Sequence, residues 1–256
     1  MRNYLIDMDG VIVRGDELIS GADAFIDRLH QRGVKFIIFT NNPMYTAFDL
    51  QHRLQRIGIR VSEDHIYTSA MATADFLAAQ MPKSSAFVLG ESGLTEALHA
   101  AGFALSDYAP DYVVLGETTT FSYARITQAI RLVAGGARFI ATNPDSSSPG
   151  EGGITPGCGA IAALIESATG VHPYYIGKPN PLMMRTALRR LGAHSENTAV
   201  VGDRMDTDIR VGLETGMETI LVLTGVTSRD MVSRFPYRPT RIVESVADLE
   251  RDEVAS

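Results

Sequence analysis

Three carboxylates follow an apolar segment of the sequence, where they could bind a divalent cation. The segment VVGDRMDTDI, residues 200–209, carries Asp203, Asp206 and Asp208. Carboxylates this close together repel one another unless a cation is nearby, and Mg²⁺ prefers oxygen ligands of this kind. Acidic residues also occur at helix N-termini, where the helix dipole stabilises them. That alternative explains Asp206 and Asp208 better than Asp203, which directly follows the apolar segment and a glycine.

A second group of acidic residues, this time a pair, ends an apolar segment near the start of the sequence. In LIDMDGV, residues 5–11, Asp7 and Asp9 are followed by Gly10, which allows the backbone to turn sharply. The carboxyl end of a strand in a parallel sheet faces the ligand crevice. We therefore expect both aspartates at the mouth of a site. An ordinary polar turn is the alternative, because Asp-x-Asp pairs are common.

Groups suited to phosphate follow two further segments. FIIFTNN, residues 36–42, contains Thr40 and Asn41, whose hydroxyl and N–H groups can bind phosphate oxygens. The same residue types are also frequent helix caps. Lys178 lies in the loop IGKP, residues 176–179, before a helix start that would favour a phosphate. A solvated surface lysine is the alternative interpretation of Lys178.

Short apolar segments alternate with helix-compatible stretches along the chain. Uniformly apolar strands that alternate with helices favour a parallel sheet covered on both faces. The sequence thus predicts an α/β fold. The segments that read as strands are 3–7, 34–39, 86–90, 112–116, 138–142, 198–202 and 219–223.

Two helices are predicted between the first strands. One spans 21–32 and ends at Gly33, and the other spans 44–57 and ends at Gly58. On the second helix we expect one broad buried face. Its members would be Phe48, Leu50, Leu54 and Ile57.

Proline, glycine and serine near two positions suggest hinges around a separate unit. These hinge segments are MPKSS at 81–85 and GKPNP at 177–181. The prediction is a core domain formed by residues 1–81 and 176–256, with an inserted domain at 82–175.

Composition excludes several classes of protein. The 256 residues are 45% apolar and 21% charged, with a formal net charge of -7. This acidity and the absence of a Lys/Arg cluster give no electrostatic support for binding a nucleic acid polymer. No apolar stretch approaches a membrane span, so no membrane partner is expected. The early aspartates argue against a secretory signal, so a cytoplasmic location is expected, and a homo-oligomer stays open.

In order, these segments resemble the four motifs of the haloacid dehalogenase (HAD) superfamily. The matching residues are DMDGV at 7–11, Thr40 in FTNN, Lys178 in GKP and GDRMDTD at 202–208. The long insert, with TSAMATADFL at 68–77 and FIATNPD at 139–145, is similar to the NagD-like nucleotide phosphatase branch. The resemblance implies a doubly wound parallel-sheet core with an inserted smaller α/β cap domain of the C2 type.

The resemblance also implies a Mg²⁺-dependent phosphomonoester hydrolase that works through an aspartyl-phosphate. Asp7 would be the nucleophile and a metal ligand. Asp9 would act as acid and base, with its backbone carbonyl on the metal. Asp203 would be a further metal ligand, and Asp208 a ligand through water or a neighbour of the ligands.

The remaining site residues would bind the substrate. Thr40, the backbone of Asn41 and Lys178 would hold the transferred phosphoryl group. In the cap, Asn143 and Asp145 would meet the substrate, so that a change at Asn143 alters the ranking of substrates. The stretch TNPD, which contains both cap residues, also suits an ordinary turn.

The expected substrates are small phosphorylated metabolites, with nucleoside monophosphates such as UMP and GMP first. The alternatives are a sugar phosphate, phosphoglycolate or pyridoxal phosphate. A different class of function is a binding module for phosphorylated metabolites that has no turnover. The segment GCGAIA, residues 157–162, fits a dinucleotide-binding pattern, but a tight helix start is the preferred interpretation because no strand is predicted before it.

Overall fold

The computed structural model describes residues 2–150 and 153–249, which form two compact units. Of these residues, the first unit contains 2–40, 47–67 and 178–249, and the second contains 41–46 and 68–177. The longer segment of the second unit begins at residue 68, 14 residues before the predicted boundary at 82. The reason is that helix α3 (Ser69–Gln80) packs against α4 (Ser92–Ala100) of the second unit.

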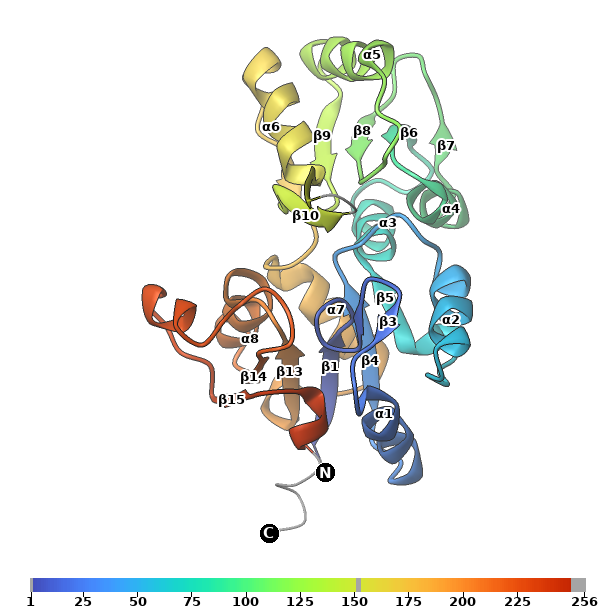
Figure 1. The fold of residues 1–256 in the computed structure, drawn as a ribbon. Helices are drawn as coiled ribbons and strands as arrows, with labels where there is room; N and C mark the ends of the chain where they lie inside the picture. The colour runs from blue at the N-terminus through green and yellow to red at the C-terminus, as the bar shows by residue number, and fades with distance from the viewer. Residues whose placement is uncertain (1, 151–152, 250–256) are drawn as a thin grey trace. The chain divides into compact units, whose positions relative to one another are not determined.

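A six-stranded sheet forms the centre of the first unit, in the order β15-β14-β13-β1-β4-β5 (Figure 1). The pairings from β15 through to β4 are parallel. The chain builds outward from β1 in one direction through β4 and β5, and later in the other through β13, β14 and β15. This order reverses between β1 and β13, where ligands bind in open α/β sheets. The strands are β1 (Asn3–Asp7), β4 (Phe36–Thr40), β5 (Ile66–Thr68), β13 (Thr198–Gly202), β14 (Glu218–Val222) and β15 (Arg241–Val243).

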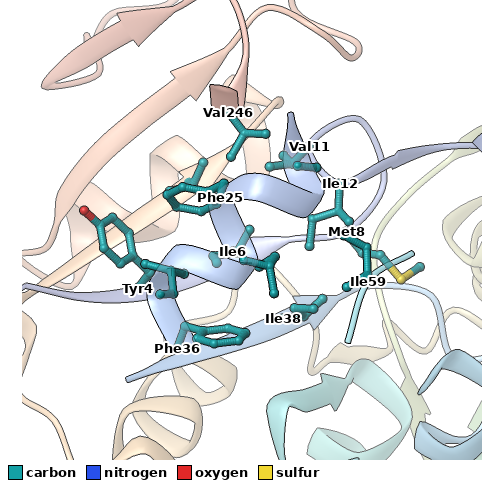
Figure 2. Packing of buried hydrophobic residues seen from close by; sticks show 14 of the residues in the cluster. Tyr4, Ile6, Met8, Val11, Ile12, Phe25, Phe36, Ile38, Ile59 and Val246 are labelled. Atoms are coloured by element: carbon teal, nitrogen blue, oxygen red, sulfur yellow. The ribbon is translucent and has the colours of Figure 1, made fainter. Parts of the chain in front are cut away.

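Helices cover both faces of this sheet, which confirms the predicted doubly wound fold. One face packs against α1 (Ala22–Gln31) and α2 (Ala47–Arg56) through a continuous apolar cluster (Figure 2). The alternate residues of the same strands are also buried, and α7 (Pro181–Leu191) and α8 (Arg210–Glu214) contact the sheet. Labelled members of the cluster include Tyr4, Ile6, Phe25, Phe36 and Ile38.

The second predicted helix differs from expectation at one residue of its face. α2 begins at Ala47, and Leu50 and Leu54 are buried as predicted, with Ile57 partly buried. Phe48 is 55% exposed and packs against His52 instead. At about 100° per residue, positions 48 and 50 lie on opposite sides of a helix, so Phe48 was wrongly assigned to the buried face.

A five-stranded sheet in the order β12-β9-β8-β6-β7 forms the second unit. All of its pairings are parallel. Helices α5 (Tyr123–Ala134) and α6 (Cys158–Thr169) pack on one face of this sheet, over a cluster that includes Phe87, Val113 and Phe139. The strands are β6 (Ser85–Leu89), β7 (Ala104–Leu105), β8 (Tyr112–Leu115), β9 (Arg138–Ala141) and β12 (Tyr174–Tyr175).

Two antiparallel hairpins complete the strands. In the first unit, β2 (Val13–Arg14), which begins four residues after Asp9, pairs with β3 (Glu17–Leu18). In the second unit, β10 (Ser147–Gly150) pairs with β11 (Gly153–Pro156). The short single-turn helices are η1 (Glu63–His65), η2 (Ser195–Asn197), the π-helical η3 (Met205–Ile209), η4 (Met231–Arg234) and η5 (Val246–Asp248). Among the described residues, no helix has the length and apolarity needed to cross a membrane.

Candidate active site

Three carboxylates meet at the edge of the first sheet where the strand order reverses. Asp7 is the last residue of β1, and Asp203 directly follows β13, the strand paired with β1. Asp208 comes from η3, which begins two residues after Asp203. Carboxylate oxygens of these three residues lie within 4.8 Å of one another, and all three side chains are buried. The structure therefore brings together three of the four aspartates predicted for the metal site.

Lys178 connects two members of this cluster. Its Nζ lies 2.7 Å from Asp7 Oδ1 and 2.8 Å from Asp208 Oδ1, and the residue is only 2% exposed. Although burial disfavours an ammonium ion, the carboxylates of Asp208 and Asp7 raise the pKa of Lys178 above its ordinary value. The ammonium also lies 4.3 Å from the ring centroid of Phe39. Lys178 is thus a buried cation of the site, and its alternative as a surface lysine is excluded.

The site has more negative charge than Lys178 can balance. Burial raises the pKa of Asp7 well above its ordinary value, against the effect of Lys178, and Asp208 and Asp203 raise it further. Burial and the carboxylate of Asp208 likewise raise the pKa of Asp203 to about 6. Two carboxyls whose pKa values are raised in this way indicate that a further positive charge belongs in the cluster.

One oxygen of the cluster marks where such a cation would bind. Asp203 Oδ2 accepts a hydrogen bond from the N–H of Val226 at 2.6 Å. Asp203 Oδ1 is buried, and within the described part of the chain it has no hydrogen-bond partner. A buried unpaired carboxylate oxygen is costly unless an ion satisfies it. The donor set, made of carboxylate oxygens alone, suits a hard divalent cation such as Mg²⁺.

A loop that the sequence analysis missed encloses Asp203. Residues 224–227 follow β14, and besides the Val226 contact, the N–H of Thr227 donates to the carbonyl of Asp203 at 3.2 Å. A Cβ at Gly225 would collide with the Asp203 side chain. On the other side Gly10, at φ +81°, would place a Cβ 2.5 Å from Asp203 Oδ2. The sequence did hold a signal for this loop. The predicted strand 219–223 must end at the same sheet edge as its parallel neighbours, so the residues that follow it belong at that edge.

Asp9 stands apart from the three clustered carboxylates. It lies in the turn between β1 and the β2–β3 hairpin, bridges to Val13, and is exposed. The protein packed around the carboxyl nevertheless desolvates it and raises its pKa, against the effects of Arg53 and Lys178. A carboxyl that is accessible and holds its proton more tightly than usual suits a proton donor.

Thr40 and Asn41 belong to different units although they are consecutive. Thr40 ends β4, next to Asp7 on β1, and is 2% exposed. Asn41 begins the second unit, and its side-chain amide donates to Asp145 Oδ2 at 2.9 Å. Parallel pairing of β1 and β4 places the Thr40 end of its strand beside the Asp7 end.

The two predicted cap residues lie together in the second unit, after β9. Asn143 is fully buried, and its amide donates to the carbonyl of Asn41 at 2.9 Å. Its side-chain oxygen accepts the N–H of Asp145 at 3.0 Å. Asp145 is partly buried. Contact of either residue with a substrate stays a prediction.

The segment 157–162 contains the start of a helix, which was the interpretation preferred from the sequence. α6 begins at Cys158, whose N–H donates to Glu117 Oε1 at 3.4 Å. The N–H groups of Gly157 and Gly159 donate to the carbonyls of Ser146 and Asp145. The segment does follow a strand, β11, but an antiparallel one in a hairpin. A helix end whose N–H groups are occupied in this way does not present a dinucleotide site.

Comparison with known proteins gives relatives that match nearly the whole chain. A family model for haloacid dehalogenase-like hydrolases matches residues 4–104, and a model described as HAD-hydrolase-like matches residues 175–249. A dihydroxyacetone phosphatase from Corynebacterium glutamicum is 53% identical over 247 residues, which is 96% of this chain and 90% of the relative. The ribonucleotide monophosphatase NagD from Escherichia coli is 43% identical over 250 residues, 98% of each protein.

Solved structures agree with these sequence matches. NagD from E. coli superposes with a TM-score of 0.91 at 44% identity, covering 97% of this chain and 98% of that one. A 4-nitrophenylphosphatase from Thermotoga maritima gives a TM-score of 0.94 at 34% identity, covering 98% of this chain and 97% of that one.

Proposed function

This chain belongs to the haloacid dehalogenase superfamily and is a phosphatase, and we propose that it hydrolyses small phosphomonoesters with Mg²⁺ through a phosphate ester of Asp7. The observation that supports this most is the arrangement around Asp7. Lys178 contacts its carboxylate, and the unpaired oxygen of Asp203 lies in the same cluster. A buried carboxylate with a cation on one side and a metal-binding cluster on the other can approach a phosphate without prohibitive repulsion.

In the proposed reaction, a carboxylate oxygen of Asp7 attacks the phosphorus, and the bond from phosphorus to the ester oxygen breaks. The carboxyl of Asp9 gives its proton to the departing alkoxide, which leaves as an alcohol. In the second half, the Asp9 carboxylate takes a proton from water while the water oxygen attacks the phosphorus. Inorganic phosphate leaves, and Asp7 is regenerated. The exposure of Asp9 and its raised pKa support this double role.

Asp7, Asp203 and Asp208 would hold Mg²⁺, with the backbone carbonyl of Asp9 as a further ligand. When bound, the ion would neutralise carboxylate charge and polarise the phosphoryl oxygens. Because Asp208 also accepts a hydrogen bond from Lys178, it would fix the ammonium as well as contribute to the cluster.

The transferred phosphoryl group would be held by Lys178, the hydroxyl of Thr40 and the backbone N–H of Asn41. Thr40 and Asp7 end neighbouring parallel strands, and Lys178 already contacts Asp7. These groups would stabilise the charge on the phosphoryl oxygens during transfer.

The substrate is proposed to be a small phosphorylated metabolite in the cytoplasm. The dihydroxyacetone phosphatase shares more residues with this chain than NagD does, at 53% against 43%. A three-carbon keto phosphate is therefore the first candidate, and the nucleoside monophosphates expected from the sequence are the second.

The test is phosphate release, with and without Mg²⁺, from dihydroxyacetone phosphate, UMP, GMP, a hexose phosphate, phosphoglycolate and pyridoxal phosphate. The proposal requires metal-dependent release that Asp7→Asn abolishes, and the ranking by kcat/KM then identifies the substrate class. Binding of these compounds with no release from any of them would support the alternative of a module without turnover.

A further inference from the structure

The chain passes between the two units immediately beside two proposed phosphate-binding residues. One crossing lies between Thr40 and Asn41, and another between Gly177 and Lys178. In each case the proposed phosphate-binding side chain belongs to the first unit, and the next residue across the peptide bond belongs to the second. Contacts of Asn41 and Gly177 within the second unit therefore lie one peptide bond away from Thr40 and Lys178.

Within the second unit, one turn holds both crossing residues. This turn, residues 142–145, follows the carboxyl end of β9. The Asn143 amide donates to the carbonyl of Asn41, and the Asn41 amide donates to Asp145 Oδ2, both at 2.9 Å. The N–H of Gly177 donates to the carbonyl of Thr142 at 2.7 Å.

The segments around Asn41 are closely packed. A Cβ at Gly177 would lie 2.5 Å from the Thr142 carbonyl oxygen and 2.6 Å from Asn41 Oδ1, so the three segments touch without space for a side chain. The hydroxyl of Ser69 donates to the same Asn41 carbonyl at 2.6 Å, and Ser69 is fully buried. The carbonyl of Asn41 thus accepts two hydrogen bonds from buried side chains.

The state of Asn143 argues against direct contact with substrate. Its exposed fraction is 0%, its amide nitrogen donates to Asn41, and its oxygen accepts from Asp145. To contact a ligand, this buried side chain would have to break both hydrogen bonds, each costly to leave unmade.

We propose that Asn143 is a positioning residue, which holds the Asn41 backbone so that the Thr40–Asn41 peptide presents its groups to the phosphoryl group. Ser69 and Asp145 assist it through the carbonyl and the side chain of Asn41. This inference rests on the proposed phosphatase function. In this proposal Asn143 does not select among substrates. It orients the residues that bind the phosphoryl group, which every substrate carries.

The two roles give different kinetics. Loss of a substrate contact changes the ranking of substrates, because each leaving group interacts differently with it. Loss of orientation lowers kcat/KM by the same factor for all substrates, since every one carries the same phosphoryl group. A displacement of about 1 Å at a reacting group can cost about 100-fold, so we expect a uniform loss of about 10- to 100-fold for Asn143→Ala.

The experiment measures kcat and KM for dihydroxyacetone phosphate, UMP and p-nitrophenyl phosphate in Asn143→Ala, Ser69→Ala and the double variant. The inhibition constant for inorganic phosphate is measured alongside. We expect a uniform loss of kcat/KM, weaker inhibition by phosphate, and a double-variant loss different from the product of the single losses, because both side chains hold one carbonyl oxygen. Asp145→Asn should lower kcat/KM uniformly and by a smaller factor than Asn143→Ala, because an amide oxygen can still accept from the Asn41 amide.

Asp111→Ala is the matched control for stability. Asp111 directly precedes β8, so it lies at the amino ends of the strands, whereas the turn 142–145 follows the carboxyl end of β9 in the same parallel sheet. The Asp111 carboxylate accepts hydrogen bonds from the N–H and the hydroxyl of Ser85. This variant should lower the melting temperature but should not cause the uniform loss of kcat/KM that is expected for Asn143→Ala.

A changed substrate ranking, or unchanged kinetics in a folded Asn143→Ala, would overturn the proposal. If that variant fails to fold, Ser69→Ala decides by the same criterion. Wild-type protein without any metal-dependent phosphate release would instead refute the proposed function, so the two failures are distinguishable.

Discussion

Replacing Asp203 by asparagine should stabilise the metal-free protein while disrupting the proposed metal site. In the wild-type protein, burial and Asp208 raise the pKa of the Asp203 carboxyl from 3.8 to about 6. The folded state therefore binds this proton more tightly than the unfolded state. The free energy of unfolding falls as the pH rises from about 4 through 6, and the full loss applies above that range.

The magnitude follows from that difference in pKa. A difference of about two units corresponds to about 3 kcal/mol at neutral pH. Neighbouring carboxylates share the effect, so we expect Asp203→Asn to gain about 1–3 kcal/mol at about pH 7.5. The asparagine oxygen can still accept the hydrogen bond from Val226. For a chain of this size, each kcal/mol raises the melting temperature by roughly 2–4 °C.

The assay is thermal and urea denaturation in EDTA at about pH 7.5 and about pH 5, where the wild-type carboxyl is largely protonated. The gain at the lower pH should be about half of that at the higher pH, because the loss accumulates between about pH 4 and pH 6. Added Mg²⁺ should stabilise the wild-type protein, because it binds only the folded state, and should stabilise the variant much less.

The control is Asp206→Asn, three positions along the chain. Asp206 is exposed and paired with Arg204 at 2.8 Å, and despite partial desolvation its pKa is lowered, chiefly by a hydrogen bond from Arg204. Its replacement should not stabilise the protein. A destabilised Asp203→Asn protein, or one with the same gain at both pH values, would refute the reasoning that charge crowding dominates this site.

Three further substitutions test the other parts of the site. Gly225→Ala forces a methyl group against the Asp203 carboxylate and should cost about 1–3 kcal/mol in denaturation experiments, with weaker stabilisation by Mg²⁺; unchanged values would contradict the close packing. Lys178→Met removes the cation beside Asp7 and should lower kcat by at least about 100-fold, so a loss below about tenfold would contradict its role. Asp9→Asn should slow alkyl phosphates more than p-nitrophenyl phosphate, whose leaving group needs no proton, and steady-state kinetics with equal losses would argue against Asp9 as the acid.

The sequence predicted the positions of residues that end uniformly apolar strands. Asp7, Thr40 and Asp203 could be placed at one sheet edge because parallel strands align their carboxyl ends. β15, which contains Arg241, and the two-residue strands β7 and β12 were missed, since they are too short or too polar to form an apolar run.

Contacts between distant segments could not be predicted in this way. The ion pair of Lys178 with Asp208 and the packing of Gly225 on Asp203 depend on how loops pack after the strands have paired. Asn41, which belongs to the second unit, donates a hydrogen bond to Asp145, more than a hundred positions along the chain. Local patterns carry no information on such pairings.

The most direct test of the central claim is to trap the phosphoryl group on the protein. Asp9→Asn, which should form the intermediate from p-nitrophenyl phosphate and hydrolyse it slowly, is mixed with this substrate and Mg²⁺. It is then quenched in acid, reduced with borohydride and digested for mass spectrometry. Borohydride converts an acyl phosphate to an alcohol, so the account predicts homoserine at Asp7 and at no other residue. Turnover without any modified residue, or with the modification elsewhere, would contradict Asp7 as the nucleophile.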